Sequence, residues 1–164
     1  MQALPRTRSC FVCGTSNPGG LALEFVTDGT IVTAKFRARP EHVGFKGVLH
    51  GGIVATVLDE VMVWVCGVRT GRFAYCAELN VRFALPVRPD EELKLIGEMV
   101  INRRDRIFEA QASLIDGKGT LRASATGVYL PIKPAAVEGM LDDFVGDIRA
   151  ILRPTASPGG GAPV

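Results

Sequence analysis

Residues 50–68 read HGGIVATVLDEVMVWVCGV, an apolar stretch that opens with His-Gly-Gly and holds one acidic pair, Asp59 and Glu60. After the His-Gly-Gly start, Thr56 and that acidic pair are its only plainly polar residues. A helix that is apolar on all sides must be buried. A carboxylate in such a helix is costly unless it is paired, hydrogen-bonded or used for chemistry. The stretch therefore predicts a buried central helix and makes the acidic pair the first candidate for a functional site.

Strand-like segments lie on both sides of this helix. The clearest is 73–85, where apolar and polar residues alternate over thirteen positions, which is the period of a half-buried strand. One face holds Phe73, Tyr75, Ala77, Leu79, Val81, Phe83 and Leu85, and the other holds Cys76, Glu78, Asn80 and Arg82. The other predicted strands are 21–26, 30–37, 91–102, 106–115 and 121–130.

The resulting order of elements is ββαββββ, which predicts an α+β fold with a curved antiparallel sheet wrapped around the long central helix. A second copy of the chain is expected to cover the side of the helix that the sheet leaves open, which predicts a homodimer or a dimer of dimers. We expect an irregular N-terminal segment at 1–20, the main domain at 21–131, an amphipathic C-terminal helix at 132–152 and a disordered tail at 153–164.

The composition excludes several classes of protein. A chain of 164 residues that is 47% hydrophobic suits one compact domain. The net charge of +2 does not indicate a nucleic-acid partner. The first ten residues lack an apolar h-region, and the longest apolar stretch carries two carboxylates, so we expect neither a secretory signal nor a membrane span. The four cysteines fit a cytoplasmic chain with reduced thiols.

The His50-Gly51-Gly52 start of the helix is a candidate oxyanion site. The first backbone N–H groups of a helix have no partner within it and lie at the positive end of its dipole. Such groups stabilise the oxyanion of an acyl-transfer step. The plain alternative is that the two glycines only form a turn into the helix.

Asp59 lies eight residues beyond Gly51, which corresponds to roughly 12 Å along the helix axis at about 1.5 Å per residue. One helix therefore cannot direct both its N-terminus and Asp59 at the same carbonyl carbon, whereas two antiparallel helices side by side can. This predicts an active site shared between subunits. Asp59 and Glu60 are about 100° apart on the helical wheel, so Asp59 is predicted to face the cleft and Glu60 to pair with a surface arginine or to contact substrate. The alternative for Asp59 is a carboxylate that only hydrogen-bonds backbone and stabilises the dimer.

The run from His50 to Asp59, H-G-G followed by an acid nine residues after the histidine, resembles the hotdog-fold acyl-CoA thioesterases of the phenylacetate-pathway type. The resemblance covers about residues 20–131 and includes the strand ELNVRFALPVRP at 78–89. The opening CFVCGTSNPGGL at 10–21 is similar to that of many uncharacterised hotdog proteins.

The resemblance implies that Asp59 is the general base or nucleophile and that the amide of Gly51 or Gly52, from the partner subunit, polarises the thioester carbonyl. His50 would orient that loop, and no metal or cofactor would be needed. The sequence departs from the family at two places. Many relatives carry Asn or Gln where Val43 and Gly44 stand, and Ser or Thr where Cys76 stands, and both changes affect how the attacking water is placed.

Other candidates are weaker. Cys10 and Cys13 have the spacing of zinc ligands, but no second pair follows them and a structural zinc site takes four ligands, so we expect no metal. Arg103 and Arg104 read as a solvated turn or as a contact for the phosphates of coenzyme A. His42 would be the base if the chain were an enoyl-CoA hydratase or dehydratase.

The sequence thus predicts a thioester hydrolase acting on acyl-CoA, with His50, Gly51 and Asp59 as catalytic residues. Five further residues are predicted to bind substrate, namely Gly52, Glu60, Cys76, Arg103 and Arg104. A non-catalytic acyl-CoA binding module and a hydratase of the same fold remain the alternatives.

Overall fold

A computed structural model describes residues 1–148 and 151–152 of the chain. Its main sheet has seven strands, β1 (Gln2–Ala3), β3 (Phe25–Thr27), β4 (Ile31–Arg37), β7 (Ala74–Phe83), β8 (Glu92–Arg103), β9 (Ile107–Asp116) and β10 (Leu121–Pro131). Two small sheets pair β2 (Arg6–Thr7) with β11 (Phe144–Val145) and β5 (Val43–Phe45) with β6 (Val48–Leu49). The helices are η1 (Pro40–His42), α1 (Gly51–Thr70), α2 (Pro134–Glu138) and η2 (Leu141–Asp143).

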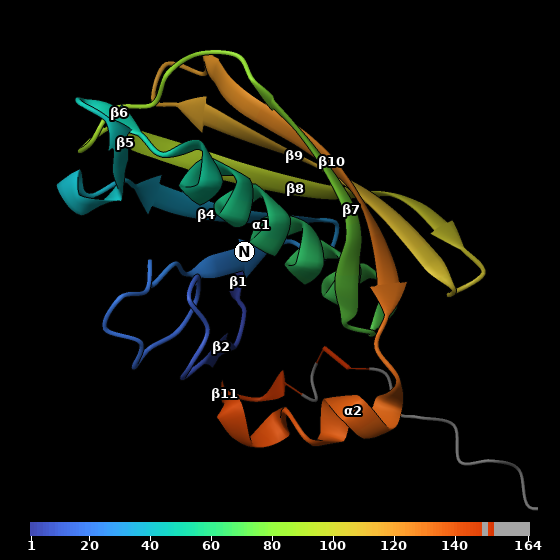
Figure 1. Ribbon diagram of the computed structural model, residues 1–164. Coiled ribbons are helices and arrows are strands. Elements are labelled where there is room, and N and C mark those ends of the chain that lie inside the picture. The colour runs from blue at the N-terminus through green and yellow to red at the C-terminus, as the bar shows by residue number, and fades with distance from the viewer. Residues whose placement is uncertain (149–150, 153–164) are drawn as a thin grey trace, which may run out of the picture.

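The main sheet is antiparallel throughout and curves around α1 (Figure 1). Its strand order is β1-β3-β4-β8-β9-β10-β7, so β7 is an edge strand although it directly follows α1 in the chain. The predicted α+β architecture and the central helix are therefore confirmed. The six predicted strands are all present, and β1 is added at the other edge.

The helix α1 begins and ends with well-formed caps. His50 is its N-cap, and the side chain of His50 accepts a hydrogen bond from the Gly52 amide at 2.9 Å. Gly71 ends it in the left-handed conformation with φ 69°, which glycine adopts without a Cβ penalty. The helix α1 is long and apolar enough to cross a membrane, but helices in the core of a protein often have the same length and composition. Here α1 lies in the hollow of the sheet.

A β-bulge in β7 changes the predicted facing of that strand. Glu78 pairs with Val128 and Cys76 pairs with Tyr129, which leaves Ala77 as the extra residue. Because a bulge shifts the alternation of side chains by one residue, Cys76 faces α1 together with Leu79, whereas Tyr75 lies on the outer face and is 58% exposed. The expectation that Tyr75 shares a face with Leu79, and Cys76 with Glu78, is therefore wrong.

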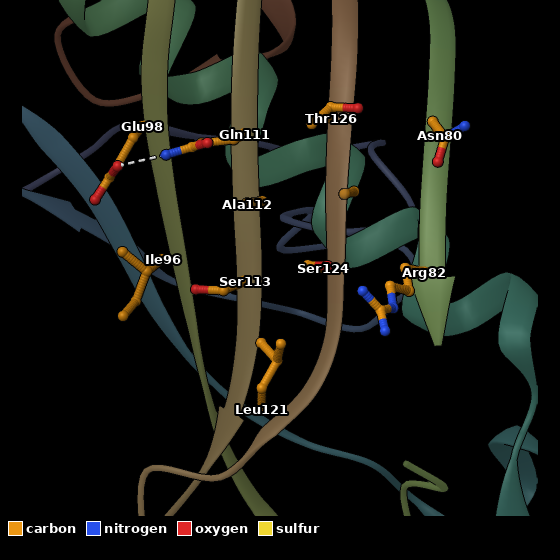
Figure 2. A pocket seen from close by; sticks show the side chains of 11 residues that line it. Asn80, Arg82, Ile96, Glu98, Gln111, Ala112, Ser113, Leu121, Ser124 and Thr126 are labelled. Atoms are coloured by element: carbon orange, nitrogen blue, oxygen red, sulfur yellow. Dashed lines mark hydrogen bonds between the residues drawn. The ribbon is translucent and has the colours of Figure 1, made fainter. Parts of the chain in front are cut away.

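The outer face of the sheet is polar. A hollow of about 380 Å³ lies on this face. Figure 2 shows the side chains of β7, β8, β9 and β10 that line it, most of which are hydroxyl, amide or charged groups. Its one carboxylate, Glu98, accepts a hydrogen bond from Gln111 at 2.9 Å. The hollow lies on the opposite side of the sheet from α1 and from the acidic pair.

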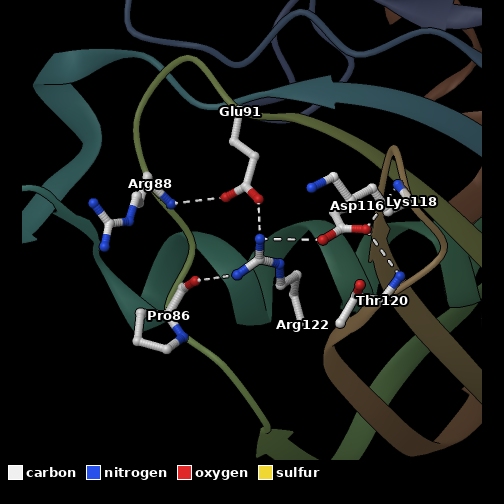
Figure 3. A network of polar contacts seen from close by, with 7 residues as sticks. All are labelled: Pro86, Arg88, Glu91, Asp116, Lys118, Thr120 and Arg122. Carbon is white, nitrogen blue, oxygen red and sulfur yellow. Dashed lines mark hydrogen bonds and ion pairs between the residues drawn. The ribbon is translucent and has the colours of Figure 1, made fainter.

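Arg122 ties together three segments at one end of the sheet (Figure 3). Its guanidinium binds the Glu91 carboxylate, the Asp116 carboxylate at 3.1 Å and the Pro86 carbonyl at 3.0 Å. Amide donors from Thr120 and Lys118 lower the pKa of Asp116, with Arg122 adding to this effect. The network fixes the β9–β10 hairpin against the loop that leads into β8.

The two ends of the described chain differ from the prediction. A long helix at 132–152 is wrong, because this region holds the five-residue α2, the turn η2 and the short strand β11. Gly146 has φ 99°, which an α-helix cannot contain, and this interrupts the apolar stripe that suggested a helix. The N-terminal segment contributes β1 and β2, and β2 pairs with β11. The predicted tail at 153–164 lies outside the described residues.

Candidate functional site at the start and middle of the central helix

Asp59 lies on α1 with its carboxylate next to Tyr129 of β10. The Tyr129 hydroxyl donates a hydrogen bond to Asp59 Oδ1 at 2.8 Å. Burial, followed by the nearby Asp59 carboxylate, raises the pKa of Tyr129 above its ordinary value, so the phenol stays protonated and remains a donor. Tyr129 is fully buried, and Gly127 makes room for it, since a Cβ at Gly127 would lie 2.6 Å from the Tyr129 ring.

Cys76 completes the surroundings of Asp59. The bulge in β7 turns the Cys76 thiol toward α1, where the thiol is close enough to Asp59 for the carboxylate to change its pKa. Burial and the Asp59 carboxylate raise the pKa of the Cys76 thiol to about 11. The structure thus brings together Asp59 and Cys76 as the sequence analysis grouped them, and it adds Tyr129. Tyr129 could not be singled out from the sequence, because it is one of several buried residues on β10.

The face of α1 that carries Asp59 is not covered by the sheet of its own chain. Gly52 is exposed, and Thr56, Asp59 and Val63 are half-buried. We call these four residues the open stripe. They follow one another at helical spacing along one side of α1, so a second helix could lie along them.

The backbone at the start of α1 offers one amide to a ligand. The Gly52 amide is taken by the His50 side chain. For the Gly51 amide, residues 1–148 and 151–152 provide no hydrogen-bond acceptor. The aromatic ring of Phe83 lies 3.4 Å from the position of a Cβ on Gly51, and Phe83 is itself 56% exposed. Of the two predicted oxyanion donors, Gly51 is therefore the one that remains open.

A hollow of about 650 Å³ lies in front of this helix start. It is lined by parts of the N-terminal segment, η1, β5 and α1, namely Phe11, Pro18, Gly19, Arg39, Glu41, His42, Val43, His50, Gly52, Ile53 and Thr56. Asp59 is not among these residues. The helix start and the acid therefore lie at separate places on one chain, as the axial separation of roughly 12 Å requires.

The positions at which the sequence departs from its resembled family also lie here. A Cβ on Gly44 would be 3.1 Å from His50 Cδ2, so any longer side chain at this position would push against His50. His42 accepts a hydrogen bond from the Arg39 amide through Nδ1, and its Nε2 contacts the Arg39 guanidinium at 3.1 Å. Burial and the charge of Arg39 lower the pKa of His42. Both ring nitrogens of His42 are thus engaged by Arg39.

Glu60 does not pair with a surface arginine, so that prediction is wrong. Its carboxylate lies beneath the N-terminal segment, where it accepts a hydrogen bond from Trp64 Nε1 at 3.2 Å and contacts Cys10 Sγ at 3.7 Å. Burial raises the pKa of Glu60 to about 8. The 100° between neighbouring helix residues places it on a different side of α1 from the open stripe, away from Asp59 and the predicted substrate.

Arg103 and Arg104 lie at the far end of the molecule from His50. They form the turn between β8 and β9, which Arg72 holds next to the end of α1 through a 2.8 Å hydrogen bond to the Asp105 carbonyl. Arg103 pairs with Glu109, and Arg104 is exposed. Within one chain, the 20 residues of α1, about 30 Å in length, separate these arginines from the helix start.

Comparison with solved structures identifies this arrangement of sheet and helix. The chain has the hotdog fold. It superposes on the thioesterase superfamily protein RHA08564 with a TM-score of 0.68 and 24% identity, covering 75% of this chain and 63% of that one. It also superposes on smu.793 of Streptococcus mutans, solved bound to acetyl CoA, with a TM-score of 0.62 and 17% identity, covering 67% and 88% of the two chains.

Sequence comparison points in the same direction. Residues 46–123 of this hotdog chain match the family model of the thioesterase superfamily. The chain is 30% identical over 126 residues to the acyl-coenzyme A thioesterase THEM4 of Bos taurus, covering 70% of this chain. It spans about half the length of that relative, 48%. The region that matches the family model contains α1 with its acidic pair and the strands β7, β8 and β9.

Proposed function

We propose that the protein is an acyl-CoA thioesterase whose active sites form between two antiparallel α1 helices of a homodimer. The observation that carries the proposal is the position of Asp59, a hydrogen-bonded carboxylate on the open stripe, eight residues beyond an N-terminal amide with room for a ligand. The thioesterase family match and the naming of THEM4 as an acyl-coenzyme A thioesterase support this substrate class. A cytoplasmic location and the phenylacetate-pathway type remain predictions.

The reaction follows from the chemistry of these groups. Asp59 takes a proton from a water molecule, and the water oxygen attacks the thioester carbonyl carbon. The carbonyl oxygen becomes negative and accepts a hydrogen bond from the Gly51 amide of the second chain. The C–S bond then breaks, the proton on Asp59 passes to the leaving thiolate, and a carboxylic acid and coenzyme A are formed. A thiolate leaves readily, so a site with one base and one amide donor is sufficient.

The substrate-binding role of Arg103 and Arg104 requires the dimer. With Gly51 of one chain opposite Asp59 of the other, the C-terminal end of each α1 lies beyond the N-terminal end of its neighbour. The turn that carries both arginines then extends past the helix start of the other chain. Their guanidinium groups suit the phosphates of coenzyme A at that distance from the thioester.

The direct test is hydrolysis of a panel of acyl-CoA thioesters, with the released thiol as the readout. We expect turnover by the wild-type chain and a loss of at least about a hundredfold in Asp59→Asn, which keeps the shape of the side chain but removes its basicity. Gly51→Pro removes the amide proton and adds the proline ring at a helix position where proline is well tolerated, and it should cost about 10²–10³ in kcat. Gly51→Ala retains the amide and is the matched control.

Two other results would replace the proposal. Tight binding of acyl-CoA without thiol release would show a binding module. Hydration of an enoyl-CoA that His42→Ala abolishes, without hydrolysis of saturated thioesters, would show a hydratase.

A further inference from the structure

Three metal-ligating side chains from distant parts of the sequence meet outside the proposed active site. Cys10 and Cys13 belong to the N-terminal segment, and Glu60 belongs to α1. Their ligand atoms all lie within 4.8 Å of one another, and Cys10 Sγ lies 3.7 Å from Glu60 Oε1. The spacing of the two cysteines was visible in the sequence, but the third group was not, because it is 47 residues beyond Cys13.

The backbone between the two cysteines is arranged around sulfur. The amides of Val12 and Cys13 donate to Cys10 Sγ at 3.2 Å and 3.5 Å. The turn closes through a 3.0 Å bond from the Gly14 amide to the Cys10 carbonyl, and a Cβ on Gly14 would lie 2.1 Å from that oxygen. Only glycine fits there. Amide donors directed at a sulfur atom stabilise the thiolate, which is the form that binds metal.

The carboxylate that completes the cluster is hydrogen-bonded but has no ion-pair partner among residues 1–148 and 151–152. Glu60 receives a hydrogen bond from Trp64 Nε1 at 3.2 Å. Across the described part of the chain, no lysine, arginine or histidine forms an ion pair with Glu60. A buried carboxylate without a cation is costly to ionise, and a divalent metal ion would supply the missing charge.

We propose that Cys10, Cys13 and Glu60 bind a zinc ion. Two thiolates and one carboxylate oxygen are ligands that Zn²⁺ accepts, and hard cations such as Mg²⁺ and Ca²⁺ prefer oxygen alone. Cys10 is partly exposed, so a water molecule can reach the fourth position. Binding displaces the thiol protons to solvent. This inference reverses the expectation that the chain binds no metal, and it does not depend on the thioesterase proposal.

The ion would fasten the N-terminal segment to the helix that carries Asp59. Phe11, which lies between the two cysteines in sequence, lines the hollow in front of the helix start. Zinc at this place therefore holds one wall of that hollow in position. Its role is to stabilise the fold around the site, since Asp59 lies on a different side of α1 from Glu60.

The first test is the metal content of the full chain purified without added chelator and dialysed against metal-free buffer. We expect about one zinc per chain by mass spectrometry. Cys10→Ser, Cys13→Ser and Glu60→Gln should each reduce the zinc content to near zero while circular dichroism shows a folded chain. Cys76→Ser removes a thiol outside the cluster and is the control that keeps its zinc.

A second test covers the case in which a ligand variant fails to fold. Metal-stripped wild-type chain is titrated with Co²⁺, and thiolate-to-cobalt charge-transfer bands that saturate at one equivalent support the proposal. A folded chain with neither zinc nor cobalt bands would overturn it. So would a denatured sample, isolated without reductant, in which peptide mass spectrometry finds Cys10 and Cys13 joined by a disulfide while the other two of the four thiols react. Neither negative result bears on thioester hydrolysis.

Discussion

The carboxylate of Asp59 is held at the edge between the protein core and the open stripe of α1. One oxygen of this carboxylate accepts a hydrogen bond from the Tyr129 hydroxyl at 2.8 Å, and the Cys76 thiol on β7 faces the carboxylate. A carboxylate with a single strong donor keeps further lone pairs for a water molecule. The surroundings therefore orient the acid without using up its capacity to accept a proton.

Tyr129→Phe should reduce kcat by about 10-fold to 100-fold with little change in KM. The change removes one hydroxyl whose hydrogen bond to a charged group is worth about 1.5–3 kcal/mol. If the hydroxyl only filled space, KM and kcat would both be unchanged. Steady-state thioester hydrolysis measures the two parameters separately. The conservative ring keeps the core filled, so a large loss of thermal stability would point to a structural role instead.

Cys76 offers a check on the charge at Asp59 that is independent of catalysis. Because the pKa of its thiol is raised to about 11, little thiolate exists at pH 8 and alkylation should be slow. Asp59→Asn removes the neighbouring negative charge, lowers the thiol pKa and should accelerate labelling several-fold at that pH. Peptide mass spectrometry after iodoacetamide treatment gives the rates. Equal alkylation rates in the wild type and in Asp59→Asn would mean that the charge of Asp59 does not influence the Cys76 thiol.

Single residues also show how far sequence reasoning reached. The apolar run from His50 correctly predicted the central helix and its start at His50. It made Asp59 a candidate because a carboxylate in an apolar helix is costly to bury. It could not identify Tyr129, which contacts Asp59 across 70 positions of sequence. It also could not tell that Glu60 meets Cys10, because helical spacing gives a direction around the axis but not the neighbour in that direction.

At the scale of elements, α1 lies very close to the sheet. Gly97 on β8 is a point of close approach, since a Cβ there would lie 2.8 Å from the Val61 carbonyl oxygen. A backbone atom cannot move aside as a flexible side chain can. The height of α1 above the sheet, and with it the position of Asp59, is therefore set by the absence of a side chain at residue 97.

Gly97→Ala should destabilise the chain by roughly 1–3 kcal/mol, because an added methyl in a tightly filled core forces backbone shifts. Gly117→Ala places the same methyl where no atom lies within 4 Å, so it should remain within about 0.5 kcal/mol of wild type. Urea unfolding followed by circular dichroism measures both. Equal midpoints for the two variants would show that α1 can move away from β8 at no cost.

The strands were predictable because apolar and polar residues alternate in their sequences, and the observed boundaries lie within four residues of the expected ones. The bulge at Ala77 was not predictable, since the alternation in the sequence continues through it without a break. The predicted C-terminal helix is absent although its apolar stripe is present, because Gly139 ends α2 and Gly146 has a positive φ that an α-helix does not contain.

On the scale of the whole molecule, two features of the described chain remain without a neighbouring element. The open stripe exposes one side of α1, and the edge strand β7 has one neighbour, β10. An uncovered edge strand is a template for pairing with another chain. A symmetric dimer in which two β7 strands pair would extend the sheet and bring two α1 helices side by side, which is the arrangement that the proposed active site needs.

The most direct test of the shared active site mixes two variant chains, one that lacks the base and one that lacks the amide donor. Asp59→Asn and Gly51→Pro homodimers should each be nearly inactive, because one lacks the base and the other lacks the amide donor. When the two chains are refolded or co-expressed together, half of the dimers are mixed, and each mixed dimer has one of its two sites intact if the site is shared.

We expect the mixture to recover about a quarter of wild-type thioesterase activity, since half of the dimers would each have half of their sites intact. Analytical ultracentrifugation and differential tagging confirm that mixed dimers have formed. If mixed dimers are present and activity stays at the level of the separate variants, Asp59 and the Gly51 amide do not serve the same site from opposite chains, and the shared-site account is contradicted.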